Sequence, residues 1–363
     1  MLPLSSRITQ ANSLLAPFAV PHGKGLGRVH PEPDDATRFP FQRDRDRILH
    51  TQAFRRLKHK TQVFVSGHGD HYRTRITHTL EVAQISRDIA RTLGLNEDLA
   101  EAIALAHDLG HTPFGHAGEE AMAACMKPFG KTFEHNLQSF RIVTLLEDRS
   151  EQYQGLNLSQ EILDGLVKHS SPHDRPTTES LPRSPSLEAQ VVNIADEIAY
   201  TAHDTDDGLR AGQFSSDDVR TTKLGALASV QATKHGTELR GAIVHLLVSD
   251  LYEATGRKLA TPSIRSLDDV YRSAEPLICF STAMQTILNE HRMFLWNRLY
   301  LSASVQRQAN RGKKIVTSLF RRFLKRPPVK VLSLQRKTGS IVEEAVKDYI
   351  AGMTDGFAIQ ENE

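Results

Sequence analysis

The segment 107–119 limits most strongly what this chain can fold into and what it can bind. It reads His-Asp-Leu-Gly-His-Thr-Pro-Phe-Gly-His-Ala-Gly-Glu and follows an apolar run at residues 99–106, which predicts the end of a buried helix. An imidazole and a carboxylate side by side at such an end need polar partners, and a divalent metal ion suits both groups. The segment therefore predicts a metal site where a buried helix ends.

The rest of the chain predicts an all-α fold. Apolar residues recur at helical spacing along most of the 363 residues, whereas the alternation typical of a half-buried strand does not recur. The one β-type run is residues 62–65, so we expect at most a short β-hairpin near residues 60–70. In the helical pattern that begins at residue 41, we expect Arg43, Arg45 and Arg47 on an exposed charged face.

The composition excludes several classes of protein. The formal net charge is only +2, so the whole molecule is neither a strongly basic nucleic-acid binder nor an acidic tail protein. Cys125 and Cys279 lack metal-ligand spacing, which is typical of a reducing compartment. No apolar run approaches the roughly 20 residues of a membrane span, and the N-terminus has no signal-peptide pattern. We therefore expect a cytoplasmic protein with no membrane partner.

Three separated stretches offer metal ligands. They are His78, the adjacent His107 and Asp108, and Asp196. Two imidazoles and two carboxylates form a mixed nitrogen and oxygen set, which suits Mn, Fe, Mg, Zn or Ni better than a metal that prefers thiolates. Each residue also has an ordinary interpretation, because a lone buried histidine is more often hydrogen-bonded in a core and Asp196 could be a salt-bridged surface residue.

The pattern of these ligands resembles that of the HD-domain metal-dependent phosphohydrolases. Further motifs resemble the deoxynucleoside triphosphate triphosphohydrolases, the dGTPase family, and lie at residues 54–64, 75–83, 107–119, 133–136 and 194–200. The resemblance implies an HD-domain helical bundle with additional C-terminal helices. It covers a phosphohydrolase core at residues 41–210 well and the C-terminal third loosely. Residues 1–40 are rich in proline and glycine and have little periodicity, so we expect an N-terminal arm there. We expect residues 211–363 to form a C-terminal helical region that packs on the core as one large domain.

The resemblance also assigns roles to the histidines and carboxylates. It implies that His78, His107, Asp108 and Asp196 bind a divalent metal (Mn, Mg, Fe or similar). By the same resemblance, His116 and Glu119 are the catalytic pair, and His111 and His135 lie along the triphosphate near the α-phosphorus. A carboxylate beside an imidazole orients the ring and favours its protonated form, ready to protonate a leaving oxygen. A second Mg²⁺ on the triphosphate is also expected.

The remaining matched residues are expected to contact substrate. Arg75 matches a phosphate-binding arginine, whose planar fork of donors suits phosphate oxygens. Gln62, Tyr200 and Asp204 match residues that contact the deoxyribose. Tyr200 under the sugar would leave no room for a 2′-hydroxyl, and Asp204 would accept from the 3′-hydroxyl. Ordinary hydrogen bonding in a loop or at a helix end remains the alternative for Gln62 and Asp204.

The implied reaction is hydrolysis of a dNTP, with dGTP a candidate, to a deoxynucleoside and inorganic triphosphate. Water attacks the α-phosphorus while His116 protonates the departing 5′-oxygen. The sequence lacks a Gly-x4-Gly-Lys-Ser/Thr loop, which argues against a P-loop NTPase. Two alternatives stay open. One is another HD-type phosphohydrolase, such as a 5′-nucleotidase or phosphodiesterase, and the other is a nucleotide-binding or nucleic-acid-binding sensor.

The resemblance further implies a homo-oligomer with a dNTP as allosteric activator. Residues 307–337 contain eleven basic residues and no acidic one. They form either a solvated helix face, a site for an activating nucleotide, or a weak binding surface for single-stranded nucleic acid.

Overall fold

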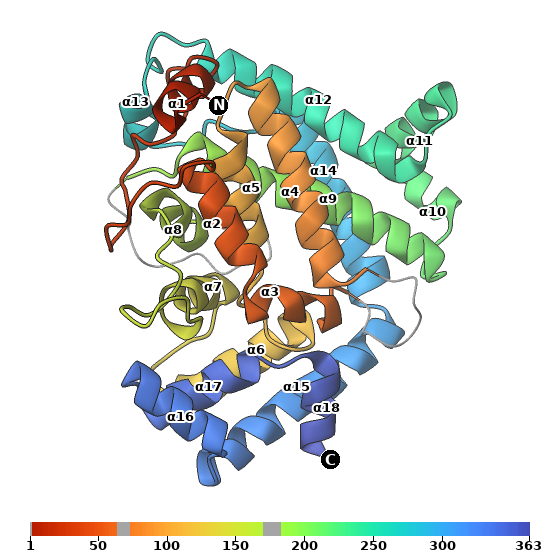
Figure 1. The fold of residues 1–363 in the computed structure, drawn as a ribbon. Coiled ribbons are helices and arrows are strands. Elements are labelled where there is room, and N and C mark those ends of the chain that lie inside the picture. Colours follow the sequence, from red (N-terminus) through yellow and green to blue (C-terminus); the bar gives the residue numbers. More distant parts are fainter. Residues whose placement is uncertain (1, 64–72, 170–182) are drawn as a thin grey trace. The chain divides into compact units, whose positions relative to one another are not determined.

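The computed structural model describes residues 2–63, 73–169 and 183–363, and in these ranges the protein is all-α (Figure 1). Eighteen α-helices are present, and the only β-type pairings among the described residues are two isolated bridges, Thr61–Thr74 and Asp148–Gly155. The predicted fold class is therefore confirmed. Part of the predicted β-type run at residues 62–65 lies outside the described residues.

The chain divides into two compact units, which we describe separately. Unit 1 comprises residues 1–25, 81–101 and 168–305, and unit 2 comprises residues 26–80, 102–167 and 306–363. The helices α4 (Arg75–Thr92), α5 (Glu97–Ala106) and α15 (Ala303–Lys325) each contribute residues to both units. The boundaries predicted at residues 40 and 210 stay a prediction.

Unit 2 contains most of the residues that the sequence motifs single out. Its remaining helices are α2 (Pro40–Leu49), α3 (Gln52–Arg56), α6 (Gly115–Met126), α7 (His135–Arg141), α8 (Gln160–Val167), α16 (Val329–Thr338), α17 (Val342–Ala351) and α18 (Asp355–Asn362). Short 3-10 turns are η1 (Leu57–His59) and η2 (Lys127–Phe129), and α7 continues into a π-helical turn, η3 (Ile142–Leu146).

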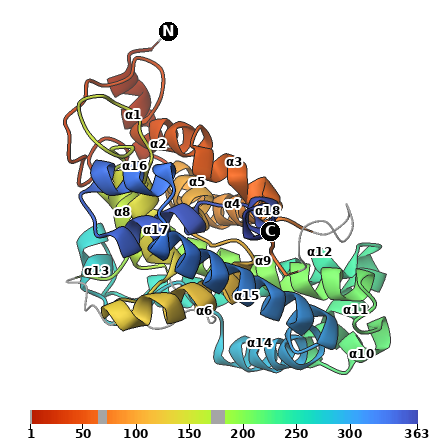
Figure 2. The ribbon, with the colours of Figure 1, turned by 90° about the horizontal axis from the view of Figure 1, so that it is seen from below.

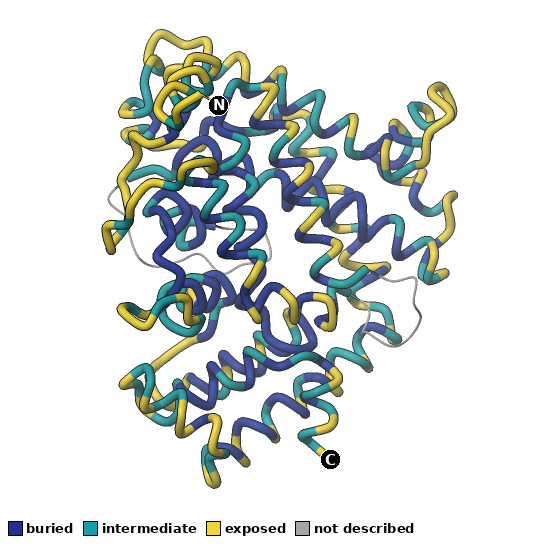
Figure 3. Tube along the Cα trace, in the orientation of Figure 1, coloured by how far each residue is buried: buried dark blue, intermediate teal, exposed yellow. Residues whose placement is uncertain are grey.

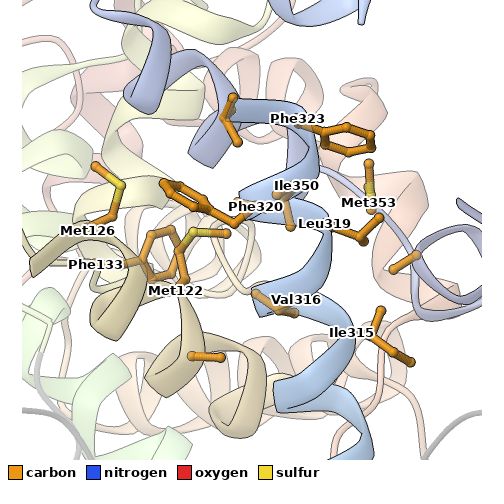
Figure 4. Close-up of a cluster of buried hydrophobic side chains, with 14 of the residues drawn as sticks. Met122, Met126, Phe133, Ile315, Val316, Leu319, Phe320, Phe323, Ile350 and Met353 are labelled. Atoms are coloured by element: carbon orange, nitrogen blue, oxygen red, sulfur yellow. The ribbon is translucent and has the colours of Figure 1, made fainter. Parts of the chain in front are cut away.

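The apolar core of unit 2 lies where α6, α15 and α17 meet. Figure 4 shows Met122 of α6, Phe320 of α15 and Ile350 of α17 directed into one cluster, and all three side chains are buried. The helices α16 and α17 lie side by side, as two views show (Figures 1 and 2). Burial of this apolar face against α6 anchors the helix that carries part of the predicted catalytic set.

Unit 1 is built around α9 (Leu187–Arg210), which is buried along most of its length (Figure 3). The other helices of unit 1 are α1 (Leu4–Asn12), α10 (Ser216–Arg220), α11 (Lys223–His235), α12 (Leu239–Leu259), α13 (Leu267–Arg272) and α14 (Thr282–Leu295), which continues into the π-helical turn η4 (Trp296–Tyr300). The side chain of Ser186 caps α9 by accepting from the backbone N–H of Ala189. The helix α12 packs on both α9 and α11.

Two local expectations differ from the structure. The helical pattern from residue 41 is interrupted at His50 and Thr51, where α2 ends and α3 begins. Arg47 is buried rather than exposed, so the expectation for this arginine is wrong. Its Nη1 donates to the carbonyl oxygens of Leu156 (2.9 Å) and Asn157 (2.7 Å), because this irregular segment has acceptors that no helix satisfies.

No helix in the described parts of the chain has both the length and the apolar character that a membrane crossing requires.

Candidate active site

The end of α5 and the start of α4 bring together three of the four predicted metal ligands. His107 and Asp108 follow the last residue of α5, and His78 lies one turn into α4. Each of the three offers a ligand atom, these atoms lie within 4.8 Å of one another, and all three side chains are buried. The pattern of separated motifs therefore converges on one small volume of unit 2.

The chemistry of this trio fits a divalent metal. The Nδ1 atom of His107 lies 2.6 Å from the carbonyl oxygen of Ala104 and must donate its proton there, because a carbonyl only accepts. Neutral His107 then carries its lone pair on Nε2, which lies 3.5 Å from Oδ1 of Asp108. A lone pair facing a carboxylate oxygen is repulsive unless a cation lies near both, and a backbone carbonyl behind a ligand histidine is the usual arrangement.

Asp108 is held in its ionised form. Its Oδ2 atom accepts from Nη1 of Arg75 at 2.9 Å, and its Oδ1 atom accepts from Nε2 of His111 at 3.0 Å. Burial acts to raise the pKa of Asp108, but the charge of Arg75 and the hydrogen bond from His111 hold this pKa well below 3.8. A charged carboxylate is therefore available to a metal at neutral pH.

A second cluster surrounds the carboxylate of Glu119. The Nδ1 atoms of His135, His116 and His111 lie 3.2, 3.6 and 3.8 Å from Oε2 of Glu119, and the backbone N–H of His135 donates to Oε1 at 2.8 Å. Burial acts to raise the pKa of Glu119, but the neighbouring His135 and His116 hold it well below 4.5. The four residues predicted as catalytic thus meet around one ionised carboxylate.

Two histidines of this cluster differ in environment. The rings of His111 and His135 stack with their centroids 3.8 Å apart, and burial lowers the pKa of His111 well below 6.5, aided by the charge of Arg75. His111 is therefore neutral and donates its Nε2 proton to Asp108. The side chain of His116 is 55% exposed, whereas those of His111 and His135 are buried, so His116 is the member that an incoming molecule can reach.

Arg75 and Gln62 meet at Gly115, the first residue of α6. A Cβ atom at Gly115 would lie 3.2 Å from Nη2 of Arg75 and 3.5 Å from the carbonyl oxygen of Gln62. Within the described chain, the buried Nε and Nη2 atoms of Arg75 and Oε1 of Gln62 have no hydrogen-bond partner. Buried polar atoms without partners are costly, so these atoms indicate that a polar ligand completes the site.

The other predicted substrate residues lie on α9 in unit 1. Asp196, Tyr200 and Asp204 are spaced four residues apart on one helix face, and all three are buried. Oδ2 of Asp196 lies 3.6 Å from Nε2 of His169. Asp204 accepts from the hydroxyl of Tyr300, whose pKa is raised well above 10 by burial and by the charge of Asp204.

Comparison with protein families matches two regions of the chain. Residues 75–201 match the HD domain, and residues 278–363 match the phosphohydrolase-associated domain. A protein of Geobacter sulfurreducens is 46% identical over 361 residues, which cover 96% of this chain and 94% of that protein. Proteins of Azoarcus sp. (strain BH72) and Thiobacillus denitrificans are 47% and 45% identical, and each alignment covers 96% of this chain and at least 95% of the relative.

All three relatives are named deoxyguanosinetriphosphate triphosphohydrolase-like protein. The chain belongs to this family. The resemblance inferred from the motifs is thereby confirmed, and the matches support a hydrolase with an HD domain. The region that matches the phosphohydrolase-associated domain includes the helices α15 to α18, which pack with α6 in the core of unit 2.

Several buried polar residues beside these clusters escaped the sequence analysis. The hydroxyl of Ser139 donates to the carbonyl oxygen of His107 at 2.7 Å and accepts from the N–H of Gly110 at 2.8 Å, which supports the turn that carries the ligands. The ammonium group of Lys60 donates to the carbonyl oxygen of His111. Lys60 lies within the motif at residues 54–64, but the motif by itself indicates no role for this lysine, and no local pattern distinguishes Ser139.

Proposed function

We propose that this protein hydrolyses deoxynucleoside triphosphates to deoxynucleoside and inorganic triphosphate. His78, His107 and Asp108 would hold a divalent metal (Mn, Mg, Fe or similar), and the sequence pattern adds Asp196 as the fourth ligand. The observation that carries the proposal is the hydrogen bond from His111 to Asp108, which joins the candidate metal ligands to the Glu119 cluster. A phosphohydrolase that expels a poor leaving group needs both a metal and a proton donor at one phosphorus atom.

The triphosphate would bind beside Arg75. Its Nη1 atom is committed to Asp108, while the donors on Nε and Nη2 have no hydrogen-bond partner within the described chain. Two donors on one edge of a guanidinium match two phosphate oxygens, and a buried position strengthens such bonds. His111 and His135 would line the phosphates near the α-phosphorus, and a second Mg²⁺ would accompany the triphosphate.

The leaving group would be protonated by His116. The ionised Glu119 lies 3.6 Å from Nδ1 of His116, so it orients the imidazole with Nε2 directed away from the carboxylate. The proton then passes from Nε2 to the 5′-oxygen as the bond between that oxygen and the α-phosphorus breaks. A divalent metal held by His78, His107 and Asp108 would supply an activated water and would offset the negative charge of the phosphates.

Preference for deoxyribose would come from Gln62, Tyr200 and Asp204. Tyr200 would pack under the sugar and exclude a 2′-hydroxyl, while Asp204 would accept a hydrogen bond from the 3′-hydroxyl. The bond from Tyr300 to Asp204 supports this role, because it holds the carboxylate in one direction on α9. Gln62 would contribute its buried amide oxygen, which has no hydrogen-bond partner in the described residues.

Product analysis tests the proposal. The protein, loaded in turn with Mn²⁺, Mg²⁺ or Fe²⁺, is incubated with each dNTP alone and in mixtures, and the products are separated by ion-exchange chromatography. We expect triphosphate with deoxynucleoside, and loss of both products in His107→Ala and Asp196→Ala. Release of pyrophosphate with monophosphate, or turnover of monophosphates or cyclic nucleotides only, would favour another HD-type phosphohydrolase. Tight nucleotide binding without turnover would favour a sensor.

We further propose, from the family resemblance, that the protein forms a homo-oligomer and that one dNTP activates hydrolysis of another. The exposed face of α15 supports an anionic partner. Its basic residues recur at intervals of three, four and seven, and the exposed ones on this stripe are Arg307, Arg311, Lys314, Arg321 and Lys325. Binding of a labelled dNTP and of single-stranded DNA at rising salt would separate an activator site from weak nucleic-acid binding, because binding to many phosphates falls steeply with salt.

A further inference from the structure

The start of α6 has an unusual backbone conformation. Phe114 and Gly115 both lie in the left-handed region, with φ values of 65° and 57°. For a residue with a bulky side chain this conformation is strained, and it persists only where neighbouring groups hold it. His116 follows directly, so the direction in which its imidazole leaves the helix depends on this turn.

The carboxylate of Asp355 holds the turn from one side. Its Oδ1 atom accepts from the backbone N–H of Phe114 at 2.9 Å, and its Oδ2 atom accepts from the backbone N–H of Thr61 at 3.0 Å and from the Thr61 hydroxyl. Asp355 is the first residue of α18 and is only 1% exposed. A single buried carboxylate therefore ties the segment that leads into His116 to the segment that leads into Gln62.

Packing also holds the turn. A Cβ atom at Gly312 of α15 would lie 2.6 Å from Cβ of Phe114, so the two helices meet so closely at Phe114 that only a glycine fits. The side chain of Phe114 belongs to the buried cluster of unit 2. Lys60 adds a third link, because its ammonium group donates to the carbonyl oxygens of His111 and Ala351. The C-terminal helices thus fix the turn by charge and by shape.

We propose that Asp355 is a positioning residue that aims His116 at the leaving oxygen by holding the Phe114–Gly115 turn. This inference rests on the proposed function, since it assigns His116 the role of proton donor. Asp355 acts through the backbone of Phe114. The C-terminal region would then be part of the catalytic apparatus, in addition to forming the core of unit 2.

The substitution Asp355→Asn tests the proposal. The amide offers one acceptor oxygen in place of two. Its NH2 group, which only donates, would therefore face the backbone N–H of either Phe114 or Thr61, and that hydrogen bond would be lost. With dNTP as substrate, where the 5′-oxygen must be protonated, we expect kcat to fall at least tenfold. With bis(p-nitrophenyl) phosphate, whose phenolate leaves without a proton, we expect kcat to fall less than about threefold. Metal content should stay unchanged.

The matched control is Asp250→Asn. Asp250 accepts a backbone N–H and a hydroxyl from Ser281, at 2.8 and 2.6 Å, just as Asp355 does from Thr61, and it has no contact with either cluster in the described structure. We expect this variant to hydrolyse both substrates at the wild-type ratio. An equal loss on both substrates in Asp355→Asn, or the same change of ratio in Asp250→Asn, would overturn the proposal.

Two further measurements cover the other outcomes. If Asp355→Asn does not fold, Gly312→Ala displaces Phe114 through its Cβ atom and should give the same selective loss. An unchanged ratio in that variant would count against the proposal. If the wild-type protein cleaves the p-nitrophenyl ester but no dNTP, the proposed substrate is wrong. Amide exchange in the peptide 111–119 then decides, because Asp355→Asn should speed it at least tenfold and an unaltered rate would contradict the role of Asp355.

Discussion

Nε2 of His111 donates to Oδ1 of Asp108 at 3.0 Å, and through this bond the candidate metal ligands and the Glu119 cluster become one continuous network. Nδ1 of the same ring lies 3.8 Å from Glu119. A change in charge or position at either end is therefore transmitted through a neutral, buried imidazole. This relationship would allow one short segment to serve both the proposed metal binding and the proposed proton transfer.

Replacement of His116 should lower the rate of catalysis but leave stability and metal binding almost unchanged. We expect His116→Asn to lower kcat for dNTP hydrolysis by about 10² to 10⁴-fold, the usual contribution of a general acid. Because its side chain is 55% exposed, the melting temperature and metal content should change little. Steady-state kinetics, calorimetry and metal analysis check this, with the exposed His50→Asn as control. Wild-type kcat in His116→Asn would remove this residue from the mechanism.

For binding of the triphosphate, the planar arrangement of N–H donors on Arg75 should matter more than the positive charge of this residue. In Arg75→Lys the ammonium group can still pair with Asp108, but the variant lacks the Nε and Nη2 donors that would bind the phosphate oxygens. We expect KM for the triphosphate substrate to rise about tenfold, with a smaller change in kcat. Arg87→Lys, at a half-exposed pair with Glu97, is the control and should leave KM unchanged. An unchanged KM in Arg75→Lys would argue against phosphate contact.

A methyl group at Gly110 should destabilise the ligand turn. A Cβ atom there would overlap the carbonyl oxygen of His135 and the backbone nitrogen of Ser139, neither of which can rotate away. We expect Gly110→Ala to lower the free energy of unfolding by about 3 kcal/mol or more. Gly256→Ala in α12 meets nothing within 4 Å and should be neutral or stabilising. Urea unfolding of the two variants distinguishes these outcomes, and equal stability would contradict the packing.

Metal binding should stabilise the folded protein. A ligand that binds only the folded state at 100 times its Kd adds about 2.7 kcal/mol, so a chelator should lower the melting temperature. We expect added Mn²⁺ to restore that temperature in the wild type and to have little effect in His107→Ala. If Mn²⁺ stabilises both proteins equally, the metal binds elsewhere.

Stability should fall with acidification through His291 of α14. Its Nε2 lies 2.8 Å from the hydroxyl of Thr205 and its Nδ1 lies 2.9 Å from that of Thr222, and burial lowers its pKa from 6.5 to about 4. The unfolded chain takes up the proton below about pH 6.5, whereas the folded protein does so only near pH 4. The contribution of His291 is therefore complete above pH 6.5 and is lost as the pH falls toward 4.

The size of this effect follows from linkage. Between pH 7 and pH 5 the wild type should lose about 2 kcal/mol of stability through this residue. His291→Asn should be less stable at pH 7 but should show a shallower pH dependence, while the exposed His245→Asn should follow the wild-type curve. Parallel curves for wild type and His291→Asn would show that another group is responsible.

Local sequence patterns were sufficient to predict the all-α fold class and most residues of the candidate active site. Helical spacing of apolar residues identifies helices without knowledge of their partners, and the buried helix before His107 has the predicted character, with Leu99 and Ala106 both fully buried. The motif residues were recognisable because their types and spacings are unusual. The roles predicted for His111, His116, His135 and Glu119 came from the resemblance of their motifs to the dGTPase family.

The supporting residues depended on contacts between distant segments. Arg47 has the same local pattern as its neighbours, yet it is buried because the backbone carbonyls near Asn157 need donors. Lys60 and Asp355 are 295 positions apart and resemble ordinary surface residues in the sequence, but folding places both beside the turn at residues 111–115. Periodicity reports which face of a helix is apolar, whereas the partner of a buried charge is set by which backbone groups the packed helices leave unsatisfied.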